Sequence, residues 1–264
     1  MRNKIGFIIL FVMMLLHGCK SVYQATYQHN PIVIDGISSD WQSALLIEKN
    51  GIVYGITNDS ASIYLLLNIG DENIQKKMFM SGLTVWIDTT GKNNAKLGIV
   101  CPIKKDIGTM KRGPMQQSDQ MKPFTKNPLI DAEFIGFEEK KRICVASSNP
   151  YGIEISINSD KYRSLIYELN IPFKSLNKEI NDFKNNDLSL GIIIEGVEMP
   201  KMEGGPNEMG GGKPDGMPGG NMGTPPSGGG PGRMPGGMPG NSSIDELKYP
   251  TKFWIKNIIL SQTK

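Results

Sequence analysis

The sequence is poor in histidine, with only His17 and His29 in 264 residues. It also lacks the G-x-S-x-G, H-E-x-x-H and P-loop patterns that place nucleophiles, zinc ligands or phosphates. The adjacent carboxylates Glu138 and Glu139 fall between two expected strands, a position typical of a solvated turn. No nucleophile and base can be assigned from these residues, so the sequence predicts a protein that is not an enzyme.

Long apolar runs are missing as well. The longest, "IGFIILFVMMLL" over residues 5–16, is too short for the roughly twenty residues that span a bilayer. With Arg2 and Lys4 before it, this run is typical of a signal peptide. The following "LHGC" resembles the bacterial lipobox, in which a cysteine is acylated after cleavage just before it. We therefore expect a signal peptide over residues 1–18 and lipidation of Cys19. A plain secretory signal is the alternative, but no A-x-A-like site follows.

Acyl chains such as palmitate on Cys19 would hold the mature protein to a membrane. In some Bacteroidetes lipoproteins an acidic run after the cysteine directs export to the cell surface. The segment "CKSVYQATYQHN" contains no acid, which favours the periplasmic face. We expect residues 19–30 to be a tether.

A strong excess of one charge is also absent. The chain has 29 Lys and Arg against 26 Asp and Glu, a net charge of +3, and the basic residues are scattered. This pattern excludes nucleic acid as an expected partner. Haem needs an axial ligand such as histidine, and the one histidine left after processing, His29, lies on the tether. Asp59, Asp71 and Asp88 stand at strand ends without a D-x-D-x-D-G loop, which favours turn capping over calcium binding. We predict no cofactor and no metal.

Cysteine is scarce too, since only Cys101 and Cys144 remain after Cys19. An oxidising compartment permits a disulfide. In "LGIVCPI" Cys101 shares the apolar face of its strand, whereas in "KRICVAS" Cys144 lies opposite its apolar neighbours. We expect no bridge, although a β-bulge could reset this alternation.

Short apolar runs, broken by glycine, asparagine and aspartate, fill residues 31–199. In "ASIYLLLNIG" alternate residues from Ile63 to Ile69 share one face. This rhythm predicts an all-β fold, a single antiparallel β-sandwich over residues 31–264. Helices are few, and the clearest spans "DENIQKKMFMSG" with Asp71 as N-cap and Gly82 after its end.

A Gly/Met/Pro-rich segment interrupts the domain at about residues 200–243. Sixteen glycines and eight prolines between Gly204 and Gly240 leave little to bury, so we expect a disordered insertion. The following "YPTKFWIKNIILS" is apolar, so we expect it to return to the domain as a closing strand. One strand beside which it could pair is "LSLGIIIEG".

The methionines of this segment leave a second function open. "MPKM" has M-x-x-M spacing, and thioethers favour Cu(I). The other methionines are irregularly spaced and no histidine accompanies them, which favours a low-complexity spacer. The corresponding alternative is a structural or interaction protein of the envelope, whose loop contacts a protein partner or Cu(I).

Four motifs together resemble one known family. "VIDGISSDW" looks like the opening of the family 9 carbohydrate-binding modules, and "NDSASIYLLLNI", "LTVWIDTTG" and "IYELNIP" follow in the same order across residues 31–198. The resemblance implies an antiparallel β-sandwich. It also implies carbohydrate binding, because characterised members grip the ends of sugar chains between aromatic rings.

The candidate ligand residues follow from strand alternation. In "LTVWID" every second residue should face the core, which sends Trp86 and Asp88 to the other face. A ring beside a carboxylate can stack on a pyranose and accept hydrogen bonds from its hydroxyls. Phe124 and Tyr151 are loop aromatics that could supply a second wall. The alternative is that a loop covers Trp86 and that its ring forms a second small core. Trp254 lies in a strand whose orientation the pattern leaves undecided.

Overall fold

The computed structural model describes residues 22–30, 32–104, 130–138, 142–183, 188–198 and 246–262. The signal peptide, Cys19, Phe124 and the Gly/Met/Pro-rich segment lie outside the described residues. Within the part of the chain that is described, no helix is long and apolar enough to cross a membrane.

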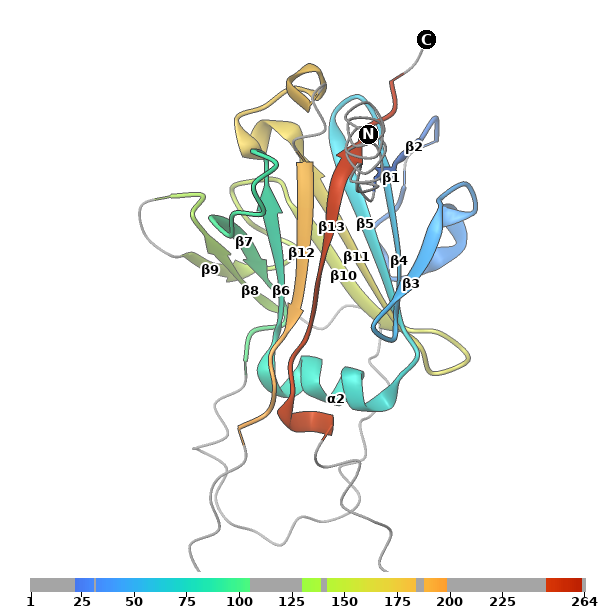
Figure 1. Cartoon of the computed structure of the whole chain (residues 1–264), viewed down its shortest axis with the longest axis vertical. Coiled ribbons are helices and arrows are strands. Elements are labelled where there is room, and N and C mark those ends of the chain that lie inside the picture. Colours follow the sequence, from blue (N-terminus) through green and yellow to red (C-terminus); the bar gives the residue numbers. More distant parts are fainter. Residues whose placement is uncertain are drawn as a thin grey trace, which may run out of the picture.

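The described strands form two sheets, which confirms the predicted all-β sandwich (Figure 1). The seven-stranded sheet contains, in spatial order, β1 (Tyr23–Gln24), β13 (Thr251–Ile259), β12 (Leu188–Ile194), β6 (Leu83–Asp88), β7 (Leu97–Val100), β8 (Asp131–Ile135) and β9 (Arg142–Val145). The six-stranded sheet contains β10 (Glu154–Ser159), β11 (Leu165–Pro172), β5 (Ser62–Ile69), β4 (Ile52–Asn58) and β2 (Thr26–Tyr27), with β3 (Leu46–Lys49) also paired to β4. The pairs β1–β13 and β2–β4 are parallel, and the remaining described pairs are antiparallel.

The core lies between the sheets and follows the predicted alternation. On β5, Ile63, Leu65, Leu67 and Ile69 are all fully buried and belong to the main apolar cluster. Each such side chain removed from water contributes about 1.5–3 kcal/mol. The sandwich is therefore held by alternate residues of strands that are distant in sequence.

The closing strand is confirmed. β13 pairs antiparallel with β12, so "KFWIKNII" returns beside "LSLGIII". Its other neighbour is β1, which contradicts the expected tether over residues 19–30. Tyr23 is buried, and its hydroxyl accepts a hydrogen bond from the Ile56 N–H at 2.8 Å. Residues 23–24 thus join the seven-stranded sheet and residues 26–27 join the six-stranded sheet, with the buried Tyr23 holding this segment in place.

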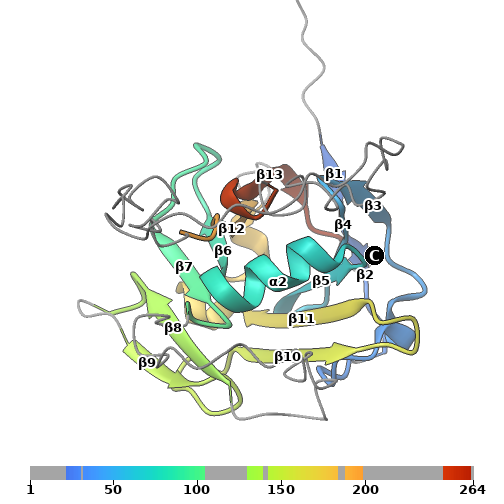
Figure 2. The same cartoon turned by 90° about the horizontal axis from the view of Figure 1, so that it is seen from below.

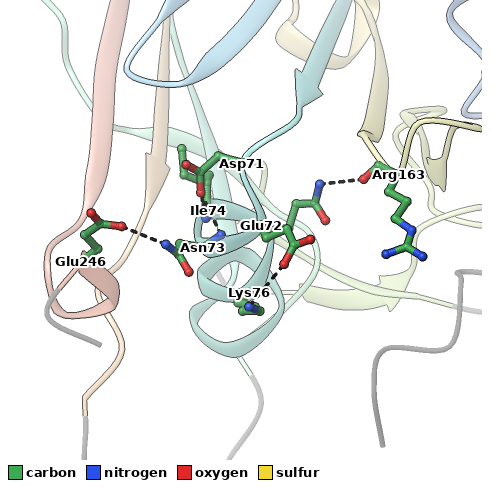
Figure 3. Close-up of polar contacts among 8 residues, drawn as sticks. Asp71, Glu72, Asn73, Ile74, Lys76, Arg163 and Glu246 are labelled. Atoms are coloured by element: carbon green, nitrogen blue, oxygen red, sulfur yellow. Dashed lines mark hydrogen bonds and ion pairs between the residues drawn. The ribbon is translucent and has the colours of Figure 1, made fainter. Parts of the chain in front are cut away.

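The helix predicted after β5 is confirmed as α2 (Glu72–Ser81), and it lies across one end of the sandwich (Figures 1 and 2). The Asp71 carboxylate accepts hydrogen bonds from the N–H groups of Asn73 and Ile74 at 2.8 and 3.0 Å (Figure 3). These bonds satisfy two of the donors that a helix start leaves free. The Asn73 amide also donates to Glu246 at 2.8 Å, which ties α2 to the helical turn at residues 246–248.

Three short 3-10 helices complete the described fold: η1 (Ser38–Trp41), η3 (Phe173–Leu176) and η4 (Ile180–Phe183). The segment that contains η1 covers the outer face of the six-stranded sheet. There Ile32 and Trp41 form a second apolar cluster with Tyr64, Leu66 and Ile166. β5 is therefore buried on both faces, which explains its continuous "LLL" run.

A buried carboxylate, Glu168 of β11, holds this N-terminal segment in place. Its Oε1 accepts a hydrogen bond from Trp41 Nε1 at 2.7 Å, and its Oε2 accepts from the N–H groups of Asp35 and Gly36 at 2.9 and 2.6 Å. Burial raises the pKa of Glu168 to about 7, against the lowering effect of these three hydrogen bonds. "VIDGISSDW" therefore serves as a structural clamp, with Gly36 required at a φ of 78°.

Both described cysteines are free, but the predicted facing of Cys144 is wrong. Cys101 is fully buried, and Cys144 pairs with the buried Ala132 and packs against the core. Its neighbour Ile143 instead points outward and is 63% exposed. Ile143 can face outward because β9 is an edge strand, and an edge strand can leave an apolar side chain in water.

Candidate functional site

Trp86 lies on β6 in the middle of the seven-stranded sheet, and its side chain is on the outer face. The alternate residues Leu83, Val85 and Ile87 are buried in the core, while Trp86 is half-buried and outside it. The direction predicted for Trp86 from strand alternation is therefore confirmed.

A second tryptophan, Trp254 of β13, stands in the same row across the strands. Gly191 of β12 pairs with Trp254 on one side and with Trp86 on the other. Trp86 in turn pairs with Gly98 of β7, and Gly98 pairs with Ile135 of β8. The outer face thus carries a row that alternates large and small residues, and side chains in such a row are neighbours.

Each indole lies against the glycine beside it. A Cβ atom added at Gly191 would be 2.9 Å from Cε2 and Cζ2 and 3.1 Å from Cδ2 of Trp254. Two of these atoms form the ring fusion, so the face of the indole, and not its edge, covers Gly191. At Gly98 an added Cβ would be 2.8 Å from Cζ3 and 2.9 Å from Cε3 of Trp86. Both glycines are buried although they face outward, because the rings cover them.

This arrangement fixes the two rings. Glycine in a strand interior is unfavourable by itself, and it often marks a place where another group approaches the backbone closely. Here an aromatic ring covers each glycine, a known way to stabilise glycine in a sheet. The Trp254 indole rests on the sheet by its face and the Trp86 indole by its six-membered ring, and the half-buried state of both side chains leaves the remaining surface to solvent. We call Trp86 and Trp254 the tryptophan platform.

Polar side chains stand in the neighbouring row of the outer face. Thr84 pairs with Ile193 on one side and Val100 on the other, and Ile193 pairs with Lys252. Thr84 is half-buried and Lys252 is exposed. A hydroxyl and an ammonium group beside the rings can hydrogen-bond the hydroxyls of a stacked ligand.

Asp88 shares this face but is turned into its own loop. It is 2% exposed, and its Oδ1 accepts hydrogen bonds from the N–H and the hydroxyl of Thr90 at 2.9 and 2.7 Å. Burial raises the pKa of Asp88, but the hydrogen bonds from Thr90 and from the backbone of Asn93 and Asn94 outweigh it and hold the pKa below its ordinary value. Asp88 is therefore an ionised turn cap, and its carboxylate is too buried to contact a ligand beside Trp86.

Tyr151 is on the other side of the sheet from Trp86. Its ring centroid lies 5.0 Å from that of the fully buried Phe134 and 4.9 Å from that of Phe137. The structure therefore does not bring Tyr151 and Trp86 together as two walls of one site. Phe124, the other candidate, lies outside the described residues. Within the described ranges no three His, Cys, Asp or Glu side chains gather as metal ligands.

The residue that sequence reasoning missed is Trp254. Two signals could have identified it. In "TKFWIKN" the exposed Lys252 and Lys256 alternate with buried Phe253 and Ile255, which places Trp254 on the outer face. Glycines inside the apolar strands β12 and β7 also indicate close approach by a large neighbour.

Comparisons with known proteins give fold-level likeness without sequence matches. No family model matches this chain, and no curated protein sequence matches it. Among solved structures, it is similar to a family 9 carbohydrate-binding module from Caldicellulosiruptor kristjanssonii in complex with cellotriose. The identity is 10%, the match covers 67% of this chain and 77% of that chain, and the TM-score is 0.34. A structure of a family 9 module from the same organism in complex with glucose gives 10% identity, coverage of 66% and 78%, and a TM-score of 0.33. Both belong to the family that the sequence motifs resemble. With TM-scores this low, the function has to be inferred from the residues of this chain.

Proposed function

We propose that this chain is a non-catalytic binding protein for carbohydrate, and that the exposed surface of Trp86 is where the sugar stacks. The observation that carries this is the contact of the six-membered ring of Trp86 with Gly98 on the outer face of the sheet, while the side chain stays only half-buried. A pyranose has an apolar face of C–H groups, and an indole is the largest apolar side-chain surface against which it can lie.

The contact between the Trp86 ring and Gly98 also favours binding by restricting the side chain before a ligand arrives. Trp86 rests on the backbone of Gly98, so its side chain has little rotamer freedom to lose when a ligand binds. Immobilising a flexible side chain opposes association by about 0.5–1.5 kcal/mol, and a ring that is already fixed avoids this term. Thr84 in the adjacent row supplies a hydroxyl for hydrogen bonds.

The test is glycan-array binding of the chain from residue 20, compared with Trp86→Ala. The matched control is Tyr162→Ala, which removes another aromatic ring, 75% exposed, from the turn between β10 and β11. We expect the wild type and Tyr162→Ala to bind the same glycans and Trp86→Ala to lose them, with all three chains folded by circular dichroism. Equal binding by Trp86→Ala, or no binding by the wild type, would overturn the proposal.

We further propose that acylated Cys19 anchors the protein in the cell envelope on the periplasmic side. The support is the apolar run over residues 5–16 followed by Gly18 and Cys19, and the lack of acids after Cys19. Cys19→Ala should abolish palmitate labelling and move the protein from the membrane to the soluble fraction. Unchanged labelling or fractionation would contradict this anchor.

A further inference from the structure

We infer that the tryptophan platform binds the interior of a single extended polysaccharide chain, which lies across the strands and contacts Trp86 and Trp254 together. This inference rests on the proposed carbohydrate binding and adds the form of the ligand. A site that holds a chain end needs walls around that end, whereas two rings on one sheet face offer an open surface.

The spacing of the rings supports a chain that spans both. Trp254 covers Gly191 of β12 and Trp86 covers Gly98 of β7, and these two strands are separated by β6. Neighbouring strands are about 4.8 Å apart, so the two ring positions are about 9.6 Å apart. With bonds of about 1.5 Å, a pyranose and its bridging oxygen extend a linear chain by about 5 Å. The two rings therefore match sugar residues n and n+2.

The alternation of a β-1,4-linked chain fits this interval. Successive residues of such a chain are turned over relative to each other, so residues n and n+2 present the same face. Both indoles lie against one face of one sheet, and both would therefore meet equivalent faces of the sugar. An extended β-1,4-linked polysaccharide is the ligand class that this row of residues fits.

The twist of the sheet distinguishes a single chain from a crystal surface. Adjacent strands are rotated by about 20–25° relative to each other. The ring positions over Gly191 of β12 and Gly98 of β7 are two strands apart, so they are rotated by about 40–50° relative to each other. A single chain can follow this rotation by turning about its glycosidic bonds. A flat crystalline surface cannot lie against both rings at once.

The absence of an opposing wall among the described residues also favours chain interiors. Among the described residues, no aromatic ring pair includes Trp86 or Trp254. Tyr151, the ring expected to face Trp86, lies on the core side with Phe134. No described aromatic ring therefore stands opposite the platform as the wall of a chain-end site.

The test is calorimetric titration of the chain from residue 20 with β-1,4-linked gluco-, xylo- and manno-oligosaccharides of one to six residues. Covering one indole face removes on the order of 50 Å² of apolar surface from water, which corresponds to about tenfold in affinity. We expect the affinity in the best series to rise about tenfold as the chain lengthens from two to four residues. Trp254→Ala should remove this rise, whereas Tyr162→Ala should behave as wild type.

A second measurement on the wild-type protein does not depend on how Trp254→Ala folds. Reduction of the terminal sugar of the hexasaccharide to its alditol should leave its affinity unchanged, and microcrystalline β-1,4-glucan should not deplete the protein from solution. Loss of binding on reduction, affinity independent of length, or depletion by the crystalline polymer would overturn the inference. If binding depends on Trp86 but not on length or Trp254, only the inference fails; if no saccharide here or on the glycan array binds, the proposed function fails with it.

Discussion

The clamp around Glu168 gives a prediction whose magnitude follows from the structure. Trp41→Phe keeps an aromatic ring in the second apolar cluster and removes the indole N–H that donates to Glu168 Oε1 at 2.7 Å. A hydrogen bond to a charged group contributes about 1.5–3 kcal/mol and one to a neutral group about 0.5–1.5 kcal/mol. The loss caused by Trp41→Phe should therefore depend on whether Glu168 is ionised.

The pKa of Glu168 sets where that dependence appears. Burial raises it from 4.5 to about 7 in the folded chain, so the folded state binds a proton more tightly than the unfolded state. The resulting stability is fully present below pH 4.5 and is lost as the pH rises to about 7, by about 3 kcal/mol in total. Above pH 7 the carboxylate is ionised and the Trp41 donor matters most.

The assay is urea unfolding of wild type, Trp41→Phe, Glu168→Gln and the double variant, followed by circular dichroism at pH 5 and pH 8.5. We expect Trp41→Phe to lower the free energy of unfolding by about 1–2 kcal/mol more at pH 8.5 than at pH 5. In the Glu168→Gln background that pH dependence should vanish, because glutamine does not titrate. An effect of Trp41→Phe that is equal at both pH values, or larger at pH 5, would refute this reasoning.

Three further predictions concern the fold. Gly36→Ala would place a Cβ atom 2.4 Å from Asn158 Cβ at a φ of 78°, so we expect the free energy of unfolding to fall by at least about 2 kcal/mol in urea titration; a loss below about 0.5 kcal/mol would contradict the clamp geometry. Asp71→Ala removes the acceptor at the start of α2 and should lower stability by about 1 kcal/mol in thermal melts, while Asp71→Asn should recover most of it. In the folded chain from residue 20, a maleimide should label Cys144 but not Cys101, because burial raises the pKa of the Cys101 thiol to about 12; two labels by mass spectrometry would show that the core around Cys101 opens.

Much of the fold could be predicted because local pattern and burial agree. Alternation on β5 and β6 assigned the core face correctly, and Asp71 and Gly82 bounded α2 by helix-end chemistry that depends only on nearby residues. The return of β13 beside β12 followed from an apolar strand that needed a partner. The pairing of residues 23–27 could not be predicted, because it depends on Tyr23 contacting a strand some thirty residues away.

The candidate site was predictable only in part. Strand alternation placed Trp86 on the outer face, but it could not show that the Asp88 carboxylate would be taken up by Thr90 two residues later. The side of the sheet occupied by Tyr151 depends on packing with Phe134, a long-range contact. The pairing of each tryptophan with a glycine depends on the register of strands far apart in sequence.

The most direct test of the sugar-binding surface is a titration of Gly98→Ala with the glycan that the wild type binds. This variant keeps every aromatic residue, yet its Cβ would lie 2.8 Å from Trp86 Cζ3, so the ring has to lift from its seat. We expect affinity to fall about tenfold, corresponding to about 1.4 kcal/mol, with the melting temperature little changed. Unchanged affinity in a folded Gly98→Ala protein would contradict the claim that the exposed surface of Trp86, held in place by contact with Gly98, is the binding surface.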